Sequence, residues 1–498
     1  MLPHPKPALK KPFFIASLSW QLFLPSSQLL GSISFDFYFG KKMAIEKKRF
    51  RFYWHLFWEF LKRHLAIILG LVVLIGAVVF LDLKFSLLQK KVFRIGLVGQ
   101  YETQNLPQQI TRLISQGLVT SNPDGSYGPA AAQGWQINNK GKEYVFQLQD
   151  NLSWDDGRSL AASDINYSYQ DLSVTAQDKQ TLIINLQESF SPLLTLLSQP
   201  IFKKNLIGLG EDYRVKKVIY QGNFINTLTL ESKTDNLPWL KIRFYPDEKS
   251  LRSAFKLGEV DIIWGVADPG QLVLYPNIKI QTELTSQQYN AIFFNLDDDL
   301  LGFKPLRQAL SYATPKPQGK SRAKGPISPD SWAYNDFVKT YDPDLSHARK
   351  LLEDNREELP EKIEITLATL PHLLETAEKT KKSWEQVGIK TNLQVVNFIP
   401  DNFQALLITQ VIPQDPDQYW FWHSSQTKTN LTHLANLRID QLLEEGRQVM
   451  NIKERREKYL DFQRFLLEES PAVFVSYPTY HYIYRQGFEN AQVPLYNK

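Results

Sequence analysis

An uninterrupted apolar run covers residues 65–81, LAIILGLVVLIGAVVFL, and contains no charged side chain. At 1.5 Å per residue, a run of this length spans roughly 26 Å, the lower end of what the hydrocarbon core of a bilayer requires. Aromatic residues between 53 and 60 precede the run and suit the boundary between membrane and water. Length, lack of charge and basic flanks favour an uncleaved membrane anchor over a buried core helix or a cleaved signal peptide. We therefore predict a transmembrane helix over 65–82.

The pattern changes after residue 94, where short strand-like and helix-like segments follow one another to the end of the chain. Tyr144, Phe146 and Leu148 alternate with polar residues, as in a half-buried strand, whereas 440–450 and 453–468 carry apolar residues at helical spacing. Alternating strands and helices predict an α/β architecture. The 404 residues from 95 onward suit two lobes better than one core.

Charge divides the chain at the same place. The whole chain carries +5, but residues 1–94 hold 15 Lys and Arg against 4 Asp and Glu, so the remainder carries −6. The heavier basic load precedes the apolar run, which predicts a single-pass cell-membrane protein with a cytoplasmic N-terminus and an extracytoplasmic C-terminal domain. The acidic remainder has no basic stripe, which argues against nucleic acid as a partner. Because the chain has no Cys, disulfides and a lipidated cysteine are excluded.

The N-terminal residues divide further. Residues 43–64 form a basic cytoplasmic, juxtamembrane segment. Residues 1–42 are apolar and aromatic in part, yet they contain Pro25 and Asp36. They are either a second membrane segment or an upstream extension of the reading frame. We favour the extension, because Met43 opens the basic segment directly before the anchor.

The most informative motifs lie between residues 118 and 169. LVTSNPDGSYGP at 118–129 contains a turn at Asp124-Gly125, and Trp154-Asp-Asp-Gly157 forms a second turn before AASDI at 161–165. The order of these pieces, with tryptophans at 135 and 154, resembles the extracellular solute-binding proteins of family 5. Those are the oligopeptide, dipeptide and nickel receptors of ABC importers. The family commonly has a histidine where this chain has Asp155.

The resemblance continues through nearly all of residues 95–498. It implies a two-lobed, periplasmic-binding-protein-like (venus flytrap) fold. Lobe 1 would span 95–265 and 470–498, and lobe 2 would span 266–469. The chain departs from the family after Ala313, where TPKPQG at 314–319 ends the helix at once and a basic loop with Lys320, Arg322 and Lys324 follows. Part of the second lobe is trimmed, which bears on ligand size and on lobe closure.

Catalytic motifs such as HExxH, GxSxG and CxxC are absent from the sequence, so we expect a binding protein and no enzyme. Gly319-Lys-Ser321 matches the end of a phosphate loop, but the required earlier Gly is Thr314. His423 and His433 lack the neighbours of a metal site, so we expect neither a metal nor another cofactor. Paired acids such as Asp155-Asp156 lie in turns, where Asp accepts backbone hydrogen bonds.

The resemblance also implies a binding segment at QDPDQYWFW, residues 414–422. In family members that take up peptides, an acidic residue near this motif pairs with the α-amino group of the ligand. Asp415 is the closest match by position and Asp417 the second; the alternative is a helix-capping turn. Aromatic side chains that follow suit a cleft or a core equally well, and we assign three of them to the ligand: Tyr419, Trp420 and Trp422. Tyr101 and Glu102 follow the first strand, where the family's cleft begins.

The implied function is capture of a peptide or similar small solute outside the cell and its delivery to an ABC transporter permease. Hinge closure of the two lobes would trap the solute. The alternative is a structural or interaction module that keeps the fold and has lost solute capture. A surface hydrolase is disfavoured because nucleophile and metal motifs are missing.

Overall fold

The computed structural model describes residues 51–67, 69–71, 73–77, 80, 91–122, 124–167 and 171–488. The chain divides into two compact units, Met1–Gln89 and Lys90–Lys498. The first unit contributes helical segments Arg51–Ile67 and Leu69–Ala77, which meet at 48°. Within the described part, no single helix has the length and apolar character to cross a membrane, although these two segments together do. The predicted segment 1–42 lies outside the described residues.

A seven-stranded sheet organises lobe 1 of the second unit, and its strand order is β12-β18-β11-β1-β10-β9-β8. β1 pairs in parallel with β10 on one side and β11 on the other. Helices α2 (Gln108–Ile114) and α4 (Glu248–Lys256) lie beside it. The strand bounds are β1 Val92–Val98, β8 Tyr213–Gln221, β9 Phe224–Ser232, β10 Trp239–Tyr245, β11 Ile262–Val266, β12 Ile278–Leu284 and β18 Thr479–Arg485.

Lobe 1 also contains a separate four-stranded antiparallel sheet with the order β4-β5-β7-β6. The alternation predicted around Tyr144 is confirmed, because Tyr144, Phe146 and Leu148 are buried on β5. Helix α3 (Leu193–Leu197) supplies further leucines to the same core. The strands of this part are β2 Val119–Ser121, β3 Tyr127–Pro129, β4 Ala132–Asn138, β5 Glu143–Leu148, β6 Leu172–Ala176 and β7 Thr181–Leu186.

Lobe 2 is built on a five-stranded sheet with the order β15-β14-β16-β13-β17. β13 is its most buried strand, and its side chains alternate between two cores: Tyr289, Ala291 and Phe293 face one, and Ile292 and Phe294 face the other. The strands are β13 Gln288–Phe294, β14 Ile363–Thr369, β15 Ile389–Val395, β16 Ala405–Val411 and β17 Ala472–Ser476. The helices are α5 Lys304–Ala313, α6 Leu345–Asp354, α7 Leu374–Gln386, α8 Tyr419–Trp422, α9 Leu437–Gln448 and α10 Ile452–Glu469.

Local caps explain where several of these helices begin. Asp247, Asp344, Asn436 and Asn451 each accept a hydrogen bond from a backbone N–H of the first turn of α4, α6, α9 and α10. α5 ends at Ala313, as expected, because the TPKP sequence that follows cannot continue a helix. The predicted helices at 440–450 and 453–468 correspond to α9 and α10.

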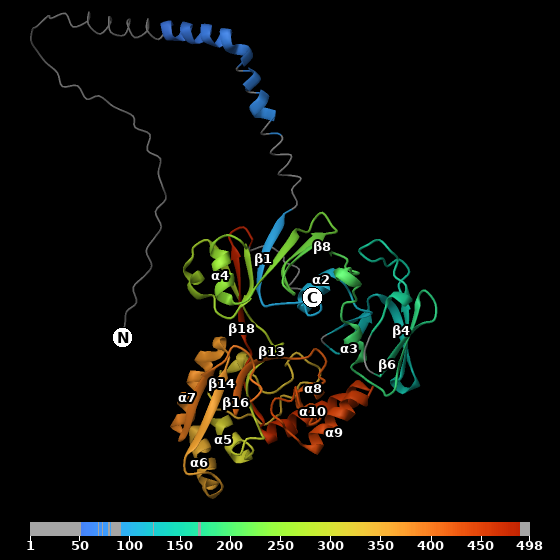
Figure 1. Cartoon of the computed structure of the whole chain (residues 1–498), viewed down its shortest axis with the longest axis vertical. Coiled ribbons are helices and arrows are strands. Elements are labelled where there is room, and N and C mark those ends of the chain that lie inside the picture. Colours follow the sequence, from blue (N-terminus) through green and yellow to red (C-terminus); the bar gives the residue numbers. More distant parts are fainter. Residues whose placement is uncertain are drawn as a thin grey trace, which may run out of the picture. The chain divides into compact units, whose positions relative to one another are not determined.

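The chain crosses between the lobes at residues 285–287 and 477–478. β12 belongs to the sheet of lobe 1, and β17 belongs to the sheet of lobe 2. Sheet membership therefore places both crossings later than the expected limits at 265/266 and 469/470. The two crossing segments lie together, since the Thr285 amide donates to the Pro478 carbonyl at 3.0 Å. In Figure 1, β18 and β13 lie at the junction of the lobes.

Candidate functional site

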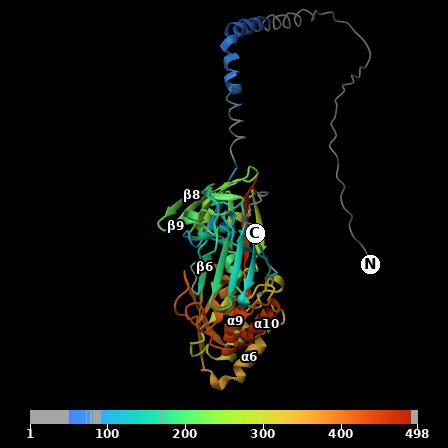
Figure 2. The same ribbon diagram turned by 90° about the vertical axis from the view of Figure 1, so that its right-hand side faces the viewer.

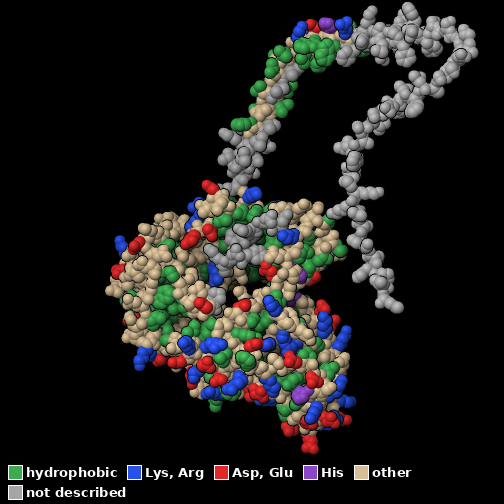
Figure 3. Space-filling model, turned by 180° about the vertical axis from the view of Figure 1, so that it is seen from behind, with side chains coloured by type: hydrophobic (Ala, Val, Ile, Leu, Met, Phe, Trp, Pro, Cys, Tyr) green, Lys and Arg blue, Asp and Glu red, His purple; other side chains and the backbone are tan. Residues whose placement is uncertain are grey.

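Both lobes direct the carboxyl ends of their parallel strands to the places where the predicted residues lie. Tyr101 and Glu102 follow β1, and α4 with Glu248 follows β10. In lobe 2, His372 follows β14, and Asp415 follows β16. Binding sites in open α/β sheets form outside the carboxyl ends of the strands. Figure 3 shows a hollow in the surface between the two lobes.

The lobes are in direct contact beside α9. The amide of Ser191, in lobe 1, donates to the Arg447 carbonyl at 2.7 Å, and the Ser189 hydroxyl donates to the Gln448 carbonyl at 2.9 Å. These carbonyls belong to the last turn of α9, where they have no partner within the helix. Lobe 1 therefore caps a helix of lobe 2. Figure 2 shows α9 and α10 at the end of the sheet that contains β6.

Asp415 is bound by an arginine of its own lobe. Arg455 Nη1 lies 2.8 Å from Asp415 Oδ2, and Nη2 lies 2.5 Å from Oδ1. Both side chains are buried, with 7% and 6% of their surface exposed. Burial alone would lower the pKa of Arg455, but the Asp415 carboxylate outweighs it and raises that pKa. The carboxylate predicted for a ligand ammonium thus already has a cation.

A third contact ties Asp415 to lobe 1. The Thr195 hydroxyl donates to Asp415 Oδ2 at 3.3 Å. Nearby, Arg112 of α2 donates to the Gln414 side chain at 3.1 Å, again across the lobes. Burial lowers the pKa of Arg112. The segment that leads into the DPD motif therefore meets lobe 1 at two points.

Asp417 has a half-buried arginine, Arg447, as its partner. Arg447 Nε lies 2.9 Å from Asp417 Oδ2, and its guanidinium carbon lies 3.8 Å from the ring centroid of Tyr419. The other face of Tyr419 stacks on His423 at 4.1 Å. Asp417 also accepts a hydrogen bond from the Tyr419 amide at 3.1 Å, which stabilises the turn that leads into α8. The Asp417 carboxylate therefore takes part both in an ion pair with Arg447 and in the turn before α8.

The aromatic side chains of residues 419–422 lie in different environments, because helix α8 points successive side chains in different directions. Trp422 has no exposed surface and packs on Phe293 and Phe474 in the core of lobe 2. Its assignment to the ligand is corrected, since it has no surface to offer a solute. Trp420 is 56% exposed. The core alternative therefore holds for Trp422.

Tyr101 is half-buried in lobe 1, where its hydroxyl donates to the Val98 carbonyl at 3.2 Å and its ring packs on Phe244. Burial raises its pKa. Glu102 is exposed, and its backbone amide donates to the Asn105 side chain. The structure therefore anchors Tyr101 and leaves the Glu102 carboxylate in solvent.

Sequence reasoning missed a row of polar side chains at one end of the lobe 2 sheet, where it passes across neighbouring strands. His372 Nε2 lies 3.2 Å from Thr409 Oγ1, Thr409 donates to Asn290 Oδ1 at 2.7 Å, and Asn290 donates to Ser476 at 3.1 Å. Burial lowers the pKa of His372, and the charge of Glu248 in lobe 1 opposes that shift. These residues come from four separate strands or loops, so spacing along the chain carries no signal for them.

Tyr480 was missed for the same reason. It stands just after the second crossing, and its hydroxyl donates to Gln288 Oε1 at 2.6 Å. Burial raises the pKa of Tyr480 to about 12, and the nearby Tyr482, Glu248 and Tyr101 add to the shift. Residues of both lobes thus surround the crossing.

The two histidines considered for metal binding have separate partners. His423 Nε2 lies 3.2 Å from Glu444 Oε1, and His433 Nδ1 lies 2.7 Å from Asp297 Oδ2. Within the residues that the structure covers, no group of three His, Asp or Glu side chains is arranged to hold a metal ion.

Two α/β lobes joined by two crossings define a fold of the periplasmic-binding-protein type. The sequence profile of the bacterial extracellular solute-binding proteins, family 5 (middle region), matches residues 126–432, more than half of the chain. The chain belongs to this family, which confirms the resemblance noted from its motifs.

Comparisons with individual proteins agree. The dipeptide-binding protein DppE of Bacillus subtilis is 22% identical over 461 residues, covering 76% of this chain and 83% of that protein. The structure of NikZ from Campylobacter jejuni in complex with Ni(L-His) has a TM-score of 0.67 and 23% identity over 80% of this chain and 95% of NikZ. The oligopeptide-binding protein AppA of Bacillus subtilis, in complex with a nonapeptide, has a TM-score of 0.64 and 19% identity, covering 80% and 95%. At these identities, the structures show the fold.

Proposed function

We propose that the chain captures a peptide or similar small solute outside the cytoplasm and delivers it to the permease of an ABC transporter. The observation that supports this most is the pair of lobes whose strand ends and cross-lobe contacts converge around Asp415, Thr195 and Arg112. The peptide class is carried over from relatives such as DppE and AppA.

Hinge closure would act through the two crossing segments, 285–287 and 477–478. Only a few residues there must change their backbone angles for the lobes to move. A solute that contacts both lobes binds the closed arrangement more tightly and shifts the population toward it. We assign solute contact to Tyr101 and Trp420, whose rings retain exposed surface, and to the polar row from His372 to Asn290.

The Asp415–Arg455 pair has a different role in this proposal. Both carboxylate oxygens of Asp415 bind Arg455, so Asp415 positions that arginine. Asp415 also accepts a hydrogen bond from Thr195 of lobe 1, and this contact favours the closed arrangement of the lobes. The solute is then recognised without a salt bridge from Asp415 to its amino group.

Titration calorimetry of the full chain in a nonionic detergent with pools of di- to nonapeptides tests the proposal. We expect saturable binding of at least one pool, and Trp420→Ala weakens it, whereas the exposed Phe337→Ala on lobe 2 does not. Absence of binding to every pool would contradict the proposal.

A membrane anchor is the second part of the proposal. Segments 51–67 and 69–77 together have the composition of a span, and basic residues precede them. An anchor would raise the effective concentration of the lobes beside the permease. We expect the full chain to sediment with membranes at high salt and a chain that starts at Lys90 to stay in the supernatant. Equal release of both by salt would count against an anchor.

One observation favours the alternative of an interaction module without solute capture. The carboxylate of Asp415, which was expected to bind a ligand ammonium, is already paired with Arg455. A module of this kind would bind none of the peptide pools and would still pull down a permease from the same membranes.

A further inference from the structure

Lobe 1 exposes four apolar side chains at one end of its seven-stranded sheet. Three of them come from the short helical turn η4 (Gly270–Leu274) and the residue after it. Val273 is 58% exposed, Leu274 79% and Tyr275 46%. The fourth is Leu257, which directly follows α4 and is 77% exposed. These four residues are called the apolar patch below.

The folded core holds the apolar patch in place. Leu272 of η4 is buried in the same core cluster as Leu251 and Phe255 of α4, so η4 is fixed on that helix. Lys256 Nζ lies 5.8 Å from the ring centroid of Tyr275, so the ends of α4 and η4 meet. Exposed apolar side chains that are scattered singly are normal. A group that the fold holds together marks an interaction surface.

The apolar patch lies at the end of the sheet where β1 begins. Arg94 Nη1, near the start of β1, donates to the carbonyl of Gly258, next to Leu257, at 2.8 Å. Tyr275 stands three residues before β12, and three strand-to-strand steps, roughly 14 Å, separate β12 from β1. Figure 1 shows α4 beside β1. The carboxyl ends of the parallel strands, where the predicted site lies, are at the opposite end of the sheet.

The chain reaches this end of lobe 1 directly from the apolar run at 65–81. Ten residues, 82–91, separate that run from β1. Even when fully extended, they span at most roughly 35 Å. An anchor formed by the apolar run would therefore keep the apolar patch close to the bilayer surface. The ten residues contain three Lys and one Asp, a composition that favours anionic headgroups.

The charges beside the apolar patch are also mainly positive. The carboxylates of Asp261 and Glu259 each pair with an arginine at 2.5 Å. Lys256, next to Leu257, and Lys279, on β12, are exposed. Among the described residues, neither lysine has a carboxylate partner. Two uncompensated cations thus accompany the apolar side chains.

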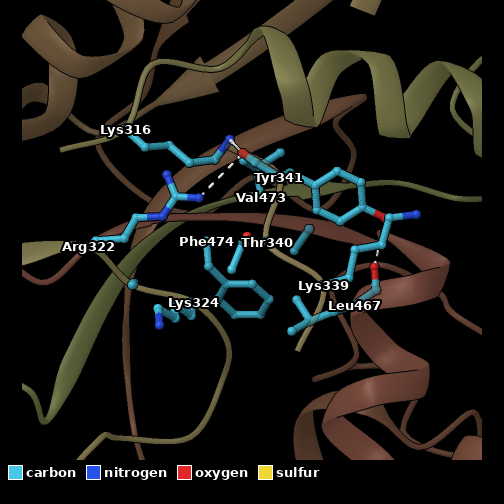
Figure 4. Close-up of a pocket in the computed structure, with 11 residues that line it drawn as sticks. Lys316, Arg322, Lys324, Lys339, Thr340, Tyr341, Leu467, Val473 and Phe474 are labelled. Atoms are coloured by element: carbon cyan, nitrogen blue, oxygen red, sulfur yellow. Dashed lines mark hydrogen bonds between the residues drawn. The ribbon is translucent and has the colours of Figure 1, made fainter. Parts of the chain in front are cut away.

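The basic loop of lobe 2 differs in this respect, because its cations are used within the lobe. Lys316 Nζ donates to the Tyr341 carbonyl at 2.7 Å, and Arg322 Nη2 donates to the same carbonyl at 3.3 Å (Figure 4). Lys324 pairs with Asp336 at 2.5 Å. These contacts explain the basic residues of the loop by the structure of lobe 2 itself. The cations beside the apolar patch have no comparable internal role.

We propose that the apolar patch docks on the surface of a lipid bilayer that contains anionic lipid. The inference rests on the membrane anchor proposed above. Leu257 and Leu274 enter the boundary between headgroups and acyl chains. Tyr275 suits the same boundary, because its ring is apolar and its hydroxyl is polar. Lys256 and Lys279 contact anionic headgroups.

The anchor makes this docking possible without a large apolar surface. Once the chain is tethered, contact between the apolar patch and the bilayer is an intramolecular event, so a weak attraction is sufficient. The docked lobe 1 would direct the carboxyl ends of its parallel strands away from the bilayer.

Site-specific fluorescence quenching on the full chain tests the proposal. Because the chain has no Cys, a single introduced Cys carries the only label. Leu274→Cys is compared with Leu437→Cys, a matched control on lobe 2, where Leu437 is 89% exposed. Each labelled chain is reconstituted in vesicles of equal parts phosphatidylcholine and phosphatidylglycerol, with and without a lipid that is spin-labelled at the top of its acyl chain.

We expect the label at 274 to lose about half or more of its fluorescence to the spin-labelled lipid, since interfacial side chains lie roughly 5–10 Å deep at this boundary. The label at 437 should lose less than about a tenth. Leu257→Asp, added to the chain labelled at 274, should reduce the quenching about twofold or more, because a carboxylate replaces an apolar contact. A melting curve checks that this exposed substitution leaves the fold intact.

Equal quenching of the two labels would overturn the proposal, as would quenching that Leu257→Asp leaves unchanged. A label at 274 that is shielded from iodide in water but is not quenched by lipid would show that a second copy of the chain covers the apolar patch. That result also overturns lipid docking. Release of the chain from the vesicles by high salt would contradict the anchor, and this inference with it. A chain that stays with the vesicles while its label at 274 is unquenched contradicts the docking alone.

Discussion

Arg455 binds both carboxylate oxygens of Asp415, although 40 residues separate the two along the chain. The pair lies inside lobe 2 and reaches lobe 1 through the Thr195 hydroxyl. The sequence predicts that Asp415 binds a cationic group of the ligand. In the folded chain, the guanidinium of Arg455 occupies the position beside the Asp415 carboxylate.

Breaking this pair should destabilise the protein. Asp415→Asn leaves the buried Arg455 without its counter-ion and should cost about 3–5 kcal/mol of unfolding free energy. Replacing both residues with leucine should cost less than either single replacement, because no unpaired charge stays buried. Urea denaturation measures both. The control is the exposed Glu375–Lys379 pair on α7, where Lys379→Ala should cost less than about 0.5 kcal/mol.

The same pair predicts how the protein treats the amino group of a peptide. A peptide that binds well should lose less than about threefold in affinity when its N-terminus is acetylated, because Asp415 is neutralised by Arg455. Calorimetry with matched free and acetylated peptides measures this. A loss of about a hundredfold would show that Asp415 leaves Arg455 for the ligand ammonium.

The two tryptophans of α8 should respond differently to truncation. Trp422→Ala removes a fully buried ring and should cost about 3–5 kcal/mol of stability. Trp420→Ala removes an exposed ring and should cost less than about 1 kcal/mol, yet it should weaken peptide binding. Denaturation and calorimetry on both variants separate the two effects. Equal stability losses would contradict the division of roles.

His372 should make the protein less stable at acidic pH. Its pKa in the folded state is lowered from the usual 6.5, chiefly by burial, so the unfolded chain binds the proton more tightly. The neutral histidine therefore contributes full stability above about pH 6.5, and this contribution declines as the pH falls toward the folded-state value. His372→Gln should flatten the decline in melting temperature between pH 7.5 and 5. His347→Gln, at an exposed position on α6, should leave the decline unchanged.

Local pattern was sufficient for most elements of the second unit. The alternation of Tyr144, Phe146 and Leu148, the two C-terminal helices and the end of α5 at Ala313 all agree with the structure. These features depend on interactions within a few residues, such as side-chain periodicity, caps and proline geometry. The family itself followed from the order of short motifs.

Long-range pairing decided what the sequence left open. The DPD motif drew attention to Asp415, but only the packing of α10 against the loop after β16 supplies its partner Arg455. The sequence of the aromatic residues 419–422 also did not predict which ring faces solvent. A single turn of α8 buries Trp422 and exposes Trp420. Residues such as His372, Thr409 and Asn290 meet because separate strands share one sheet edge. The spacing of residues along the sequence predicts strands and helices. The partner of a charged side chain such as Asp415 depends on the tertiary structure, because it comes from a distant element that the fold brings within hydrogen-bond distance.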